Sequence, residues 1–393
     1  MPGYFEFFAP VKIVAGEKAL EHIPFELASL GSKRPMIVTD KGVHDAGLVR
    51  WVEAALAEAG VPIAAVYDGV PPDSSTTVVT EIAKVYRDSG ADALVAVGGG
   101  SVIDTAKGVN ILVSEGGDDL EAYSGSGALV RKLKPCFVVP TTSGTGSEVT
   151  LVAVIQDVER GLKLPFSSSF LLPDAAILDP RMTLKLPAQL TAATAMDAMT
   201  HAVESFISLA KNPVSDAYAI GAIRKVSENL VPTLENLGNA RLRLELAVAA
   251  TMAGIAFSNS MVGMVHSLGH SVGACCHIHH GTCMSILLPH VLRYNLDARR
   301  DEIGELLLPL AGAEVYAATP KAQRAEAAIA TIDSLKDELR TLTGLPRSLA
   351  ETEKVKREDL EPIAKMSLDD GSLIYNAAEA NLDDALRVLE NAW

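Results

Sequence analysis

The chain has 393 residues, hydrophobic residues make up 48% of it, and its formal net charge at pH 7 is −15. This length exceeds what one hydrophobic core usually serves, so two domains are expected. The negative charge argues against nucleic acid and anionic membrane surfaces as partners. It does not exclude a phosphorylated cofactor, because backbone amides at a helix N-terminus bind phosphate without basic side chains.

The cysteine pattern and the first residues predict a location for the protein. The four cysteines form neither a C-x-x-C pair nor an evenly spaced framework, which is typical of free thiols in a reducing compartment. The chain opens as MPGYFEFFAP, without the pattern of a signal or transit peptide, and no apolar run reaches the ~18 residues of a membrane span. We therefore expect a cytoplasmic protein.

The first half of the sequence alternates short apolar, β-branched runs with segments of helical periodicity, after an early strand or pair of strands within residues 4–14. Further strands are expected at 36–39, 61–67, 93–97, 136–139, 151–156 and 175–178, and helices at 45–59, 75–88 and 102–114. This alternation predicts a parallel, Rossmann-like sheet with helices packed on it.

After Asp179-Pro180 the strand signals nearly vanish, and Ala-, Leu- and Glu-rich segments dominate. Helices are expected near 189–210, 214–236, 239–260, 262–276, 283–294, 301–308, 320–342 and 379–391. The sequence thus predicts an α/β domain at 1–183 followed by an all-α domain at 184–393, and the motifs described next mark the first as dinucleotide-binding and the second as metal-binding.

Two glycine-containing loops follow expected strands. Gly98-Gly-Gly-Ser101 lies where a buried strand meets a helix, and the second loop reads PTTSGTGSE at 140–148. The first loop is not the G-x-G-x-x-G fingerprint, and a tight structural turn would explain it alone. Ligands of open α/β sheets bind beyond the carboxyl ends of strands, so two such loops together favour a dinucleotide.

Two further residues are candidates for cofactor contacts. Asp40 ends the strand at 36–39, where a carboxylate can accept hydrogen bonds from a ribose hydroxyl and would repel the 2′-phosphate of NADP. The alternative for Asp40 is a helix or turn cap. Lys163 could reach a phosphate or a ribose, and the alternative is a solvated surface lysine.

Histidines cluster in the stretch MVHSLGHSVGACCHIHHG at 264–281, which holds five of the nine in the chain. Asp197 and His201 stand four residues apart and so share one face of a helix, as do His266 and His270. Both pairs lie among small apolar residues, where an unpaired polar group is costly. A carboxylate with several imidazoles suits a divalent metal ion.

The residues alone leave the ligand set open. His266 and His270 could both bind a metal ion, and three histidines, His277, His279 and His280, compete for a further position. The soft ligands Cys275 and Cys276 are rivals. A surface ion pair at Asp197 and His201, or a buried but satisfied core histidine, would be the plain structural explanations.

Several motifs resemble those of the iron-containing, group III alcohol dehydrogenases and run in that family's order. They are GGGSVIDTAK at 98–107, PTTSGTGSEVT at 140–150, LPDAAILDP at 172–180, MDAMTHAVES at 196–205, GMVHSLGHSVGACCHIHHGTCMSILLPHV at 263–291 and DGSLIYN at 370–376. The resemblance implies a nucleotide-binding domain followed by a helical domain.

The resemblance also implies roles for individual residues. It implies that Asp197, His201, His266 and His280 are the metal ligands, and that His270 is not a ligand but transfers a proton near the substrate. The implied cofactor contacts are Asp40, Gly98, Gly99, Gly100, Ser101, Thr141, Thr142 and Lys163. The chain departs from the family pattern at Pro72-Asp73-Ser74, at the alanine after Asn376 and at Cys275-Cys276.

The implied function is the reversible, NAD-dependent oxidation of a primary alcohol, a short-chain aliphatic alcohol or diol, to the aldehyde by hydride transfer. Fe²⁺ is the expected metal, with Zn²⁺, Ni²⁺ and Mn²⁺ as alternatives. The alternatives in function are a polyol or glycerol-type dehydrogenase and a non-redox, NAD-using lyase resembling dehydroquinate synthase. The expected partners are the small-molecule alcohol and aldehyde and further copies of the chain, as a homodimer or larger homo-oligomer.

Overall fold

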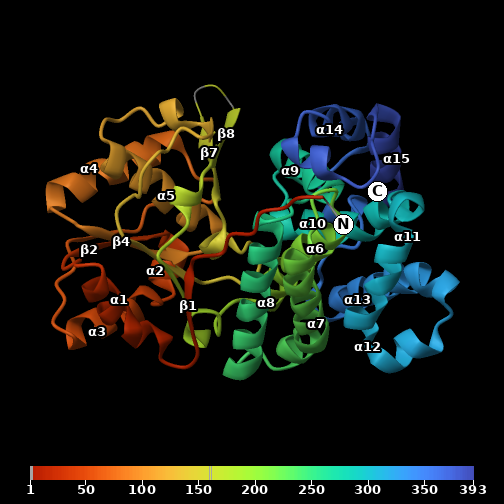
Figure 1. Ribbon diagram of the computed structural model, residues 1–393, viewed down its shortest axis with the longest axis horizontal. Helices are drawn as coiled ribbons and strands as arrows, with labels where there is room; N and C mark the ends of the chain where they lie inside the picture. The colour runs from red at the N-terminus through yellow and green to blue at the C-terminus, as the bar shows by residue number, and fades with distance from the viewer. Residues whose placement is uncertain (1–2, 159, 161) are drawn as a thin grey trace. The chain divides into compact units, whose positions relative to one another are not determined.

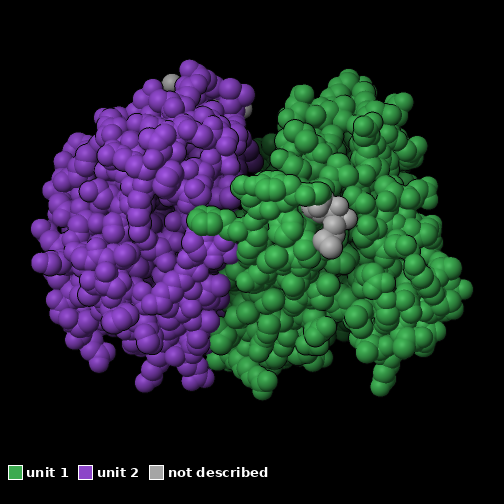
Figure 2. Space-filling model, in the orientation of Figure 1, with its two compact units in different colours: residues 1–8, 186–393 green, residues 9–185 purple. Residues whose placement is uncertain are grey.

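The structure is a computed structural model that describes residues 3–158, 160 and 162–393. Its chain forms two compact units, which Figure 2 shows in different colours. One unit is Ala9–Lys185, and the other is Leu186–Trp393 together with the segment up to Phe8.

The Ala9–Lys185 unit is built on a six-stranded parallel sheet (Figure 1). In spatial order its strands are β1 (Lys12–Ala15), β9 (Ala175–Leu178), β6 (Cys136–Pro140), β4 (Ala93–Gly98), β2 (Pro35–Thr39) and β3 (Ala65–Tyr67). Its helices are α1 (Ile23–Ser29), α2 (Lys41–Asp45), α3 (Val49–Glu58), α4 (Thr76–Ser89) and α5 (Gly100–Glu115). The predicted Rossmann-like sheet is confirmed.

The central strands are apolar on both faces because helices cover both sides of the sheet. Along β4, Leu94 and Ala96 belong to one buried cluster with residues of α4 and α5. Val95 and Val97 belong to another cluster with residues of α1 and α3. The alternation follows from the two-residue period of a strand.

A second sheet was not predicted as such. It joins β5 (Gly125–Ser126), β8 (Leu162–Ser167) and β7 (Val152–Asp157), with β8 between the other two. At the N-terminus, the strand expected within 4–14 is β1 at Lys12–Ala15, so only the last three residues of the expected range are in the sheet. Residues 3–8 belong to the helical unit instead, where the Phe8 amide donates to Asn259 Oδ1 at 2.7 Å.

The second unit is helical, as predicted. Its α-helices are α6 (Ala188–Ile207), α7 (Pro213–Glu235), α8 (Ala240–Ser258), α9 (Met264–Cys276), α10 (His280–Tyr294), α11 (Leu296–Glu305), α12 (Leu307–Ala318), α13 (Arg324–Thr343), α14 (Leu360–Ser367) and α15 (Leu382–Ala392). The expected helix at 301–308 spans the junction of α11 and α12. Helix α6 is buried throughout Thr191–Ile207 and packs against α7, α8 and α10. A charge on this helix therefore faces protein rather than water.

Among the described residues, none of the helices combines the length and the apolar character that crossing a membrane requires.

Candidate metal centre and nucleotide-binding loops

Four of the predicted site residues meet in the helical unit. Asp197 and His201 lie one turn apart on the buried helix α6, His266 lies on α9, and His280 is the first residue of α10. The Oδ1 atom of Asp197 is 3.8 Å from His201 Nδ1, 4.0 Å from His266 Nε2 and 3.3 Å from His280 Nε2.

The unpaired atoms at this point fit a metal ion. One ligand atom from each of Asp197, His201 and His266 lies within 4.8 Å of the other two. The Oδ1, Nδ1 and Nε2 atoms of these residues are buried, and none has a hydrogen-bond partner in the part of the chain that the structure describes. Leaving a buried polar atom unsatisfied costs about 1–3 kcal/mol. Three such atoms aimed at one point are explained by a ligand that accepts all three lone pairs.

The protonation states also suit a metal. Burial lowers the pKa of His201 to about 3 and holds that of His266 well below its usual value, so both rings are neutral at neutral pH. Burial would raise the pKa of Asp197, but the positive potential of His201 and His280 outweighs it and holds that pKa below the usual range. Metal binding needs a carboxylate and neutral imidazoles, and the site provides them.

Glycine at 281 explains why His280 reaches Asp197. A Cβ atom at Gly281 would lie 2.2 Å from the carbonyl oxygen of Ala193, so the start of α10 touches the backbone of α6. His280 is not in the set of three within 4.8 Å, and its side chain is 37% exposed. It therefore approaches Asp197 from the solvent-accessible side of the centre.

The competing candidates lie differently. His277 ends α9 in the left-handed conformation, with φ of 52°, and turns the chain toward α10. His279 occupies the N-cap position of α10. Cys275 is exposed, and Cys276 is half-buried with its Sγ 4.0 Å from Asp359 Oδ2. Among the described residues, neither cysteine belongs to the group that could hold a metal ion.

His270 stands beside the centre without joining it. Its ring stacks on that of His280, with centroids 5.3 Å apart, and its Nδ1 lies 2.8 Å from Asp370 Oδ2. Asp370 also caps the short helix Gly371–Tyr375 by accepting from the Ser372 amide. Burial would raise the pKa of Asp370, but its hydrogen bond to His270 outweighs this and keeps the carboxylate ionised.

Two carboxylates of the site were not predicted, Glu204 and Asp370. Glu204 follows His201 by one turn on α6, and its Oε2 lies 2.5 Å from His266 Nδ1. Its spacing of seven from Asp197 and its place in MDAMTHAVES were the available signals. Asp370 opens the DGSLIYN motif, but nothing local in the sequence connects it with His270.

In the other unit, the predicted nucleotide loops meet at one edge of the sheet. The register pairs Thr39 with Val97 and Gly98 with Pro140, so Asp40, the Gly98–Ser101 loop and Thr141 all follow adjacent strand ends. The sixteen-residue helix α5 starts at Gly100, and its N-terminus presents amide donors at this edge.

A side chain at Gly98 or Gly100 would crowd its neighbours, as expected where backbone must approach a phosphate. A Cβ at Gly98 would lie 2.5 Å from Val102 Cγ2, and one at Gly100 would lie 3.0 Å from Thr145 Cγ2. At Gly99 the same atom would come within 3.4 Å of Thr142 Cγ2. The two predicted loops thus pack against each other.

Two charged residues of α5, Lys107 and Asp104, hold the second loop and the strand β7 that follows it. Lys107 Nζ donates to the carbonyl oxygens of Thr150 and Val152 at 2.9 and 2.8 Å. Asp104 accepts from Ser147 Oγ at 2.7 Å and from the Val154 amide at 3.0 Å. Burial lowers the pKa of Lys107 and raises that of Asp104.

The remaining cofactor candidates have structural contacts of their own. Asp40 Oδ1 accepts from the Val43 amide at 2.9 Å and caps α2, which is the alternative considered for it. Ser101 Oγ donates to the carbonyl of Pro72. Lys163 is exposed on β8, opposite Gln156 of β7, in the smaller sheet. Capping by one oxygen leaves Asp40 Oδ2 for another donor.

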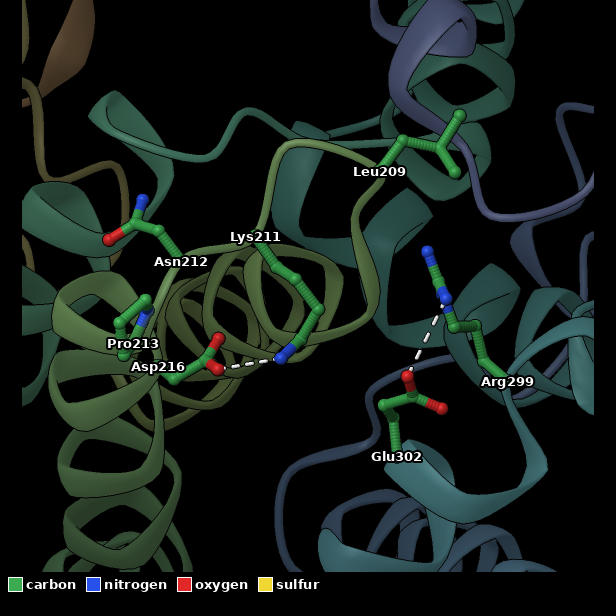
Figure 3. A pocket seen from close by; sticks show the side chains of 7 residues that line it. All are labelled: Leu209, Lys211, Asn212, Pro213, Asp216, Arg299 and Glu302. Carbon is green, nitrogen blue, oxygen red and sulfur yellow. Dashed lines mark hydrogen bonds and ion pairs between the residues drawn. The ribbon is translucent and has the colours of Figure 1, made fainter. Parts of the chain in front are cut away.

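A pocket of about 260 Å³ lies elsewhere in the helical unit (Figure 3). Its lining residues are Leu209, Lys211, Asn212, Pro213, Asp216, Arg299 and Glu302. Lys211 Nζ pairs with Asp216 Oδ2 at 2.6 Å, and Arg299 Nη1 pairs with Glu302 Oε1 at 3.5 Å. The charges are therefore balanced in pairs, and none of the clustered histidines lines this pocket.

Comparison with known proteins places the chain in a family. Residues 10–180 match the family described as iron-containing alcohol dehydrogenase, and residues 191–393 match the C-terminal part described as Fe-containing alcohol dehydrogenase family. The chain is 36% identical to an NAD-dependent methanol dehydrogenase of Bacillus methanolicus, covering 98% of this chain and 99% of that one. It is also 36% identical to a 1,3-propanediol dehydrogenase of Klebsiella pneumoniae, covering 99% of both.

The fold agrees with these matches. The crystal structure of a 1,3-propanediol oxidoreductase superposes with a TM-score of 0.94 at 36% identity, covering 99% of this chain and 100% of that one. Both halves of the chain are covered. The chain belongs to the iron-containing alcohol dehydrogenase family and is an oxidoreductase of that family.

Proposed function

We propose that this protein catalyses the NAD-dependent, reversible oxidation of a primary alcohol, either a short-chain aliphatic alcohol or a diol, to the aldehyde. The observation that carries the proposal is the convergence of the unpaired Asp197, His201 and His266 atoms, with His280 against Asp197. The relatives named for methanol and 1,3-propanediol both act on primary alcohols, which supports this substrate class.

In this proposal Asp197, His201, His266 and His280 hold a divalent metal, Fe²⁺ in the first place. When bound, the metal supplies a Lewis acid that lowers the pKa of the alcohol hydroxyl. The bound nicotinamide supplies the hydride acceptor. The ring of Phe257, stacked on His201 at 4.3 Å, shields this side of the centre from water.

In this proposal His270 accepts the proton that the alcohol hydroxyl loses. Asp370 accepts a hydrogen bond from Nδ1–H of His270, which leaves Nε2 with the lone pair that can take a proton. The imidazole is 39% exposed, so the proton can pass on to solvent. In the reverse direction, the same nitrogen returns a proton to the alkoxide that forms from the aldehyde.

The cofactor assignment concerns the α/β unit. Gly98, Gly99, Gly100 and Ser101 hold the pyrophosphate at the start of α5, with Thr141 and Thr142 in the neighbouring loop. Asp40 binds the ribose and selects NAD over NADP, and Lys163 contacts a phosphate or ribose. In this proposal residues 1–183 bind NAD, and residues 184–393 bind the metal and carry the catalytic residues.

The proposed setting is a cytoplasmic homodimer or larger homo-oligomer that acts on small molecules. Support for self-association comes from β1, which forms an edge of the six-stranded sheet and has Ile13 exposed. An unpaired edge strand can be extended by a strand from a second copy.

The test is a panel of alcohols and aldehydes run with protein reconstituted anaerobically with Fe²⁺, Zn²⁺, Ni²⁺ or Mn²⁺. Steady NADH production from ethanol, 1-propanol or 1,3-propanediol is the expected result. A strong preference for glycerol would favour a polyol dehydrogenase. Net-redox-neutral turnover without NADH accumulation would favour a lyase, and either outcome would overturn the proposed substrate class.

A further inference from the structure

The carboxylate of Glu204 is buried next to the metal centre without pointing into it. The residue is 2% exposed and lies on α6, one turn beyond His201. Its Oε2 is 2.5 Å from Nδ1 of His266, and its Oε1 accepts from the amide of Val265 at 2.6 Å. One side chain therefore holds both the imidazole of His266 and the backbone beside it.

The contact with Val265 belongs to the beginning of α9. Gly263, the N-cap residue, makes no side-chain cap of its own, so the first amides of α9 are bound by other segments. Val265 donates to Glu204, and Met264 donates to Asn376 Oδ1 at 3.2 Å. A negative carboxylate at a helix N-terminus is also favoured by the helix dipole.

Glycine at 263 is what lets both acceptors reach the helix. A Cβ atom there would lie 2.9 Å from Asn376 Oδ1 and 3.3 Å from Glu204 Oε1. A larger residue would push one acceptor away. The absence of a side chain at Gly263 thus allows Glu204 of α6 to bind the start of α9 directly beside His266.

The contact with His266 decides which of its nitrogens carries the proton. An ionised carboxylate only accepts hydrogen bonds, so Nδ1 of His266 donates to Glu204 when Glu204 is ionised. The lone pair then lies on Nε2, the atom that is 4.0 Å from Asp197 Oδ1 and has no hydrogen-bond partner among the described residues. Metal-binding histidines depend on such partners for tautomer and ring orientation.

We propose that Glu204 is a positioning residue that fixes His266 with Nε2 free to bind the metal and thereby sets the metal affinity of the centre. The inference rests on the proposed function only in requiring that Asp197, His201, His266 and His280 hold a metal. It assigns Glu204 no contact with substrate or cofactor. Carboxylates in this position typically contribute 10–100-fold to metal affinity.

Glu204→Gln tests the inference. Glutamine has one acceptor oxygen in place of two, so it can accept a hydrogen bond from Val265 or from His266 through that oxygen, while its NH₂ group faces the other. When its NH₂ group faces His266, the proton moves to Nε2 and the ring can no longer bind the metal. Fe²⁺ affinity is measured anaerobically by competition with a chromophoric chelator. The expected result is about 10–100-fold weaker binding, with turnover restored as the Fe²⁺ concentration is raised.

Two controls separate positioning from general loss of structure. Asn376→Ala removes the other acceptor at the start of α9 but does not touch His266, so it is expected to lower the unfolding temperature while changing Fe²⁺ affinity far less than Glu204→Gln. Glu245→Gln, at the ion pair with Lys225 on α7 and α8, is expected to leave Fe²⁺ affinity unchanged. If Glu204→Gln does not fold, Glu204→Asp, which keeps the charge but shortens its reach, is expected to weaken binding in the same direction.

The outcomes are distinct. Wild-type Fe²⁺ affinity in folded Glu204→Gln, or equal losses in Glu204→Gln and Asn376→Ala, would overturn the inference. If one of these outcomes is found while the wild-type protein binds Fe²⁺ and His266→Ala does not, only the role of Glu204 is overturned and the proposed function stands. If the wild-type protein itself binds no Fe²⁺, Zn²⁺, Ni²⁺ or Mn²⁺, the proposed function fails first.

Discussion

Nδ1 of His270 lies 2.8 Å from Oδ2 of Asp370, a residue one hundred positions later in the chain. The contact fixes one nitrogen of an imidazole whose ring also stacks on His280. Since the other nitrogen is left to exchange protons, the pair has the arrangement of an oriented general base.

His270→Ala is expected to lower kcat by about 10²-fold or more, the usual effect of losing a general acid or base. The Fe²⁺ content should stay at the wild-type level, because His270 is not among the proposed ligands. Asp370→Asn should show a smaller loss, since the amide oxygen still accepts from Nδ1. Steady-state kinetics with metal analysis of each sample checks this, with exposed His22→Ala as the control. Loss of iron together with activity in His270→Ala would show that this residue is a ligand.

Gly281→Ala is expected to weaken metal binding through the backbone. The added Cβ would overlap the Ala193 carbonyl, so α10 must move away from α6 and carry His280 with it. Overpacking of this kind typically costs 1–3 kcal/mol of stability. The Fe²⁺ dissociation constant and the unfolding temperature are the measurements. Gly238→Ala, where the nearest atom to the new Cβ is 3.9 Å away, is the matched control. An unchanged Fe²⁺ affinity in Gly281→Ala would contradict the role given to this close approach.

Lys107→Met is expected to destabilise the α/β unit and the second glycine loop. The substitution removes the donor to the carbonyl oxygens of Thr150 and Val152, and leaving a buried polar group unsatisfied costs about 1–3 kcal/mol. Urea unfolding measures the loss, and NAD binding by calorimetry reports whether the 140–150 loop keeps its place. Lys84→Met, at an exposed i,i+4 pair with Asp88, should cost under about 1 kcal/mol. Equal effects of the two substitutions would rule out a special role for the buried Lys107.

His290 is expected to make stability depend on pH in acid. Burial is the main reason that its pKa falls from 6.5 to about 4, with Lys336 and Arg293 adding to the effect. Because the folded-state pKa is the lower one, the unfolded chain binds more protons between these values, and stability is lost as pH falls from 6.5 to 4. The difference corresponds to about 3 kcal/mol. In His290→Gln the free energy of unfolding should fall less over this range, and an identical slope in both proteins would contradict the prediction.

The main sheet could be predicted from the sequence because its central strands are buried on both faces. Apolar runs such as Ala93–Val97 are bounded by turn residues, and the intervening helices imply parallel pairing. The smaller sheet was harder to read. In β8, Leu164 and Phe166 face inward between exposed residues, and Pro165 weakens the strand signal. Helix α14 was not among the helices expected from the sequence, and it begins at the end of the charged stretch at 351–361.

The candidate metal ligands could be predicted from the sequence only in part. The i,i+4 spacing of Asp197 and His201 in an apolar segment carries information because the helix is buried, and the structure shows this burial. The choice among His277, His279 and His280 was not available from spacing. The position of His280 beside Asp197 follows from the left-handed turn at His277 and from the contact of Gly281 with Ala193, which are tertiary features. Asp370 depends in the same way on a contact between distant segments.

X-ray absorption at the iron edge of the Fe²⁺-loaded protein tests the proposed metal centre most directly. The expected spectrum shows one iron per chain with oxygen and imidazole nitrogen ligands only, and the imidazole scattering decreases in His266→Ala and His280→Ala. A sulfur ligand at about 2.3 Å, the usual metal–thiolate distance, would bring Cys275 or Cys276 into the centre. That result, or imidazole scattering unchanged by both substitutions, would contradict the assignment of Asp197, His201, His266 and His280 as the ligands.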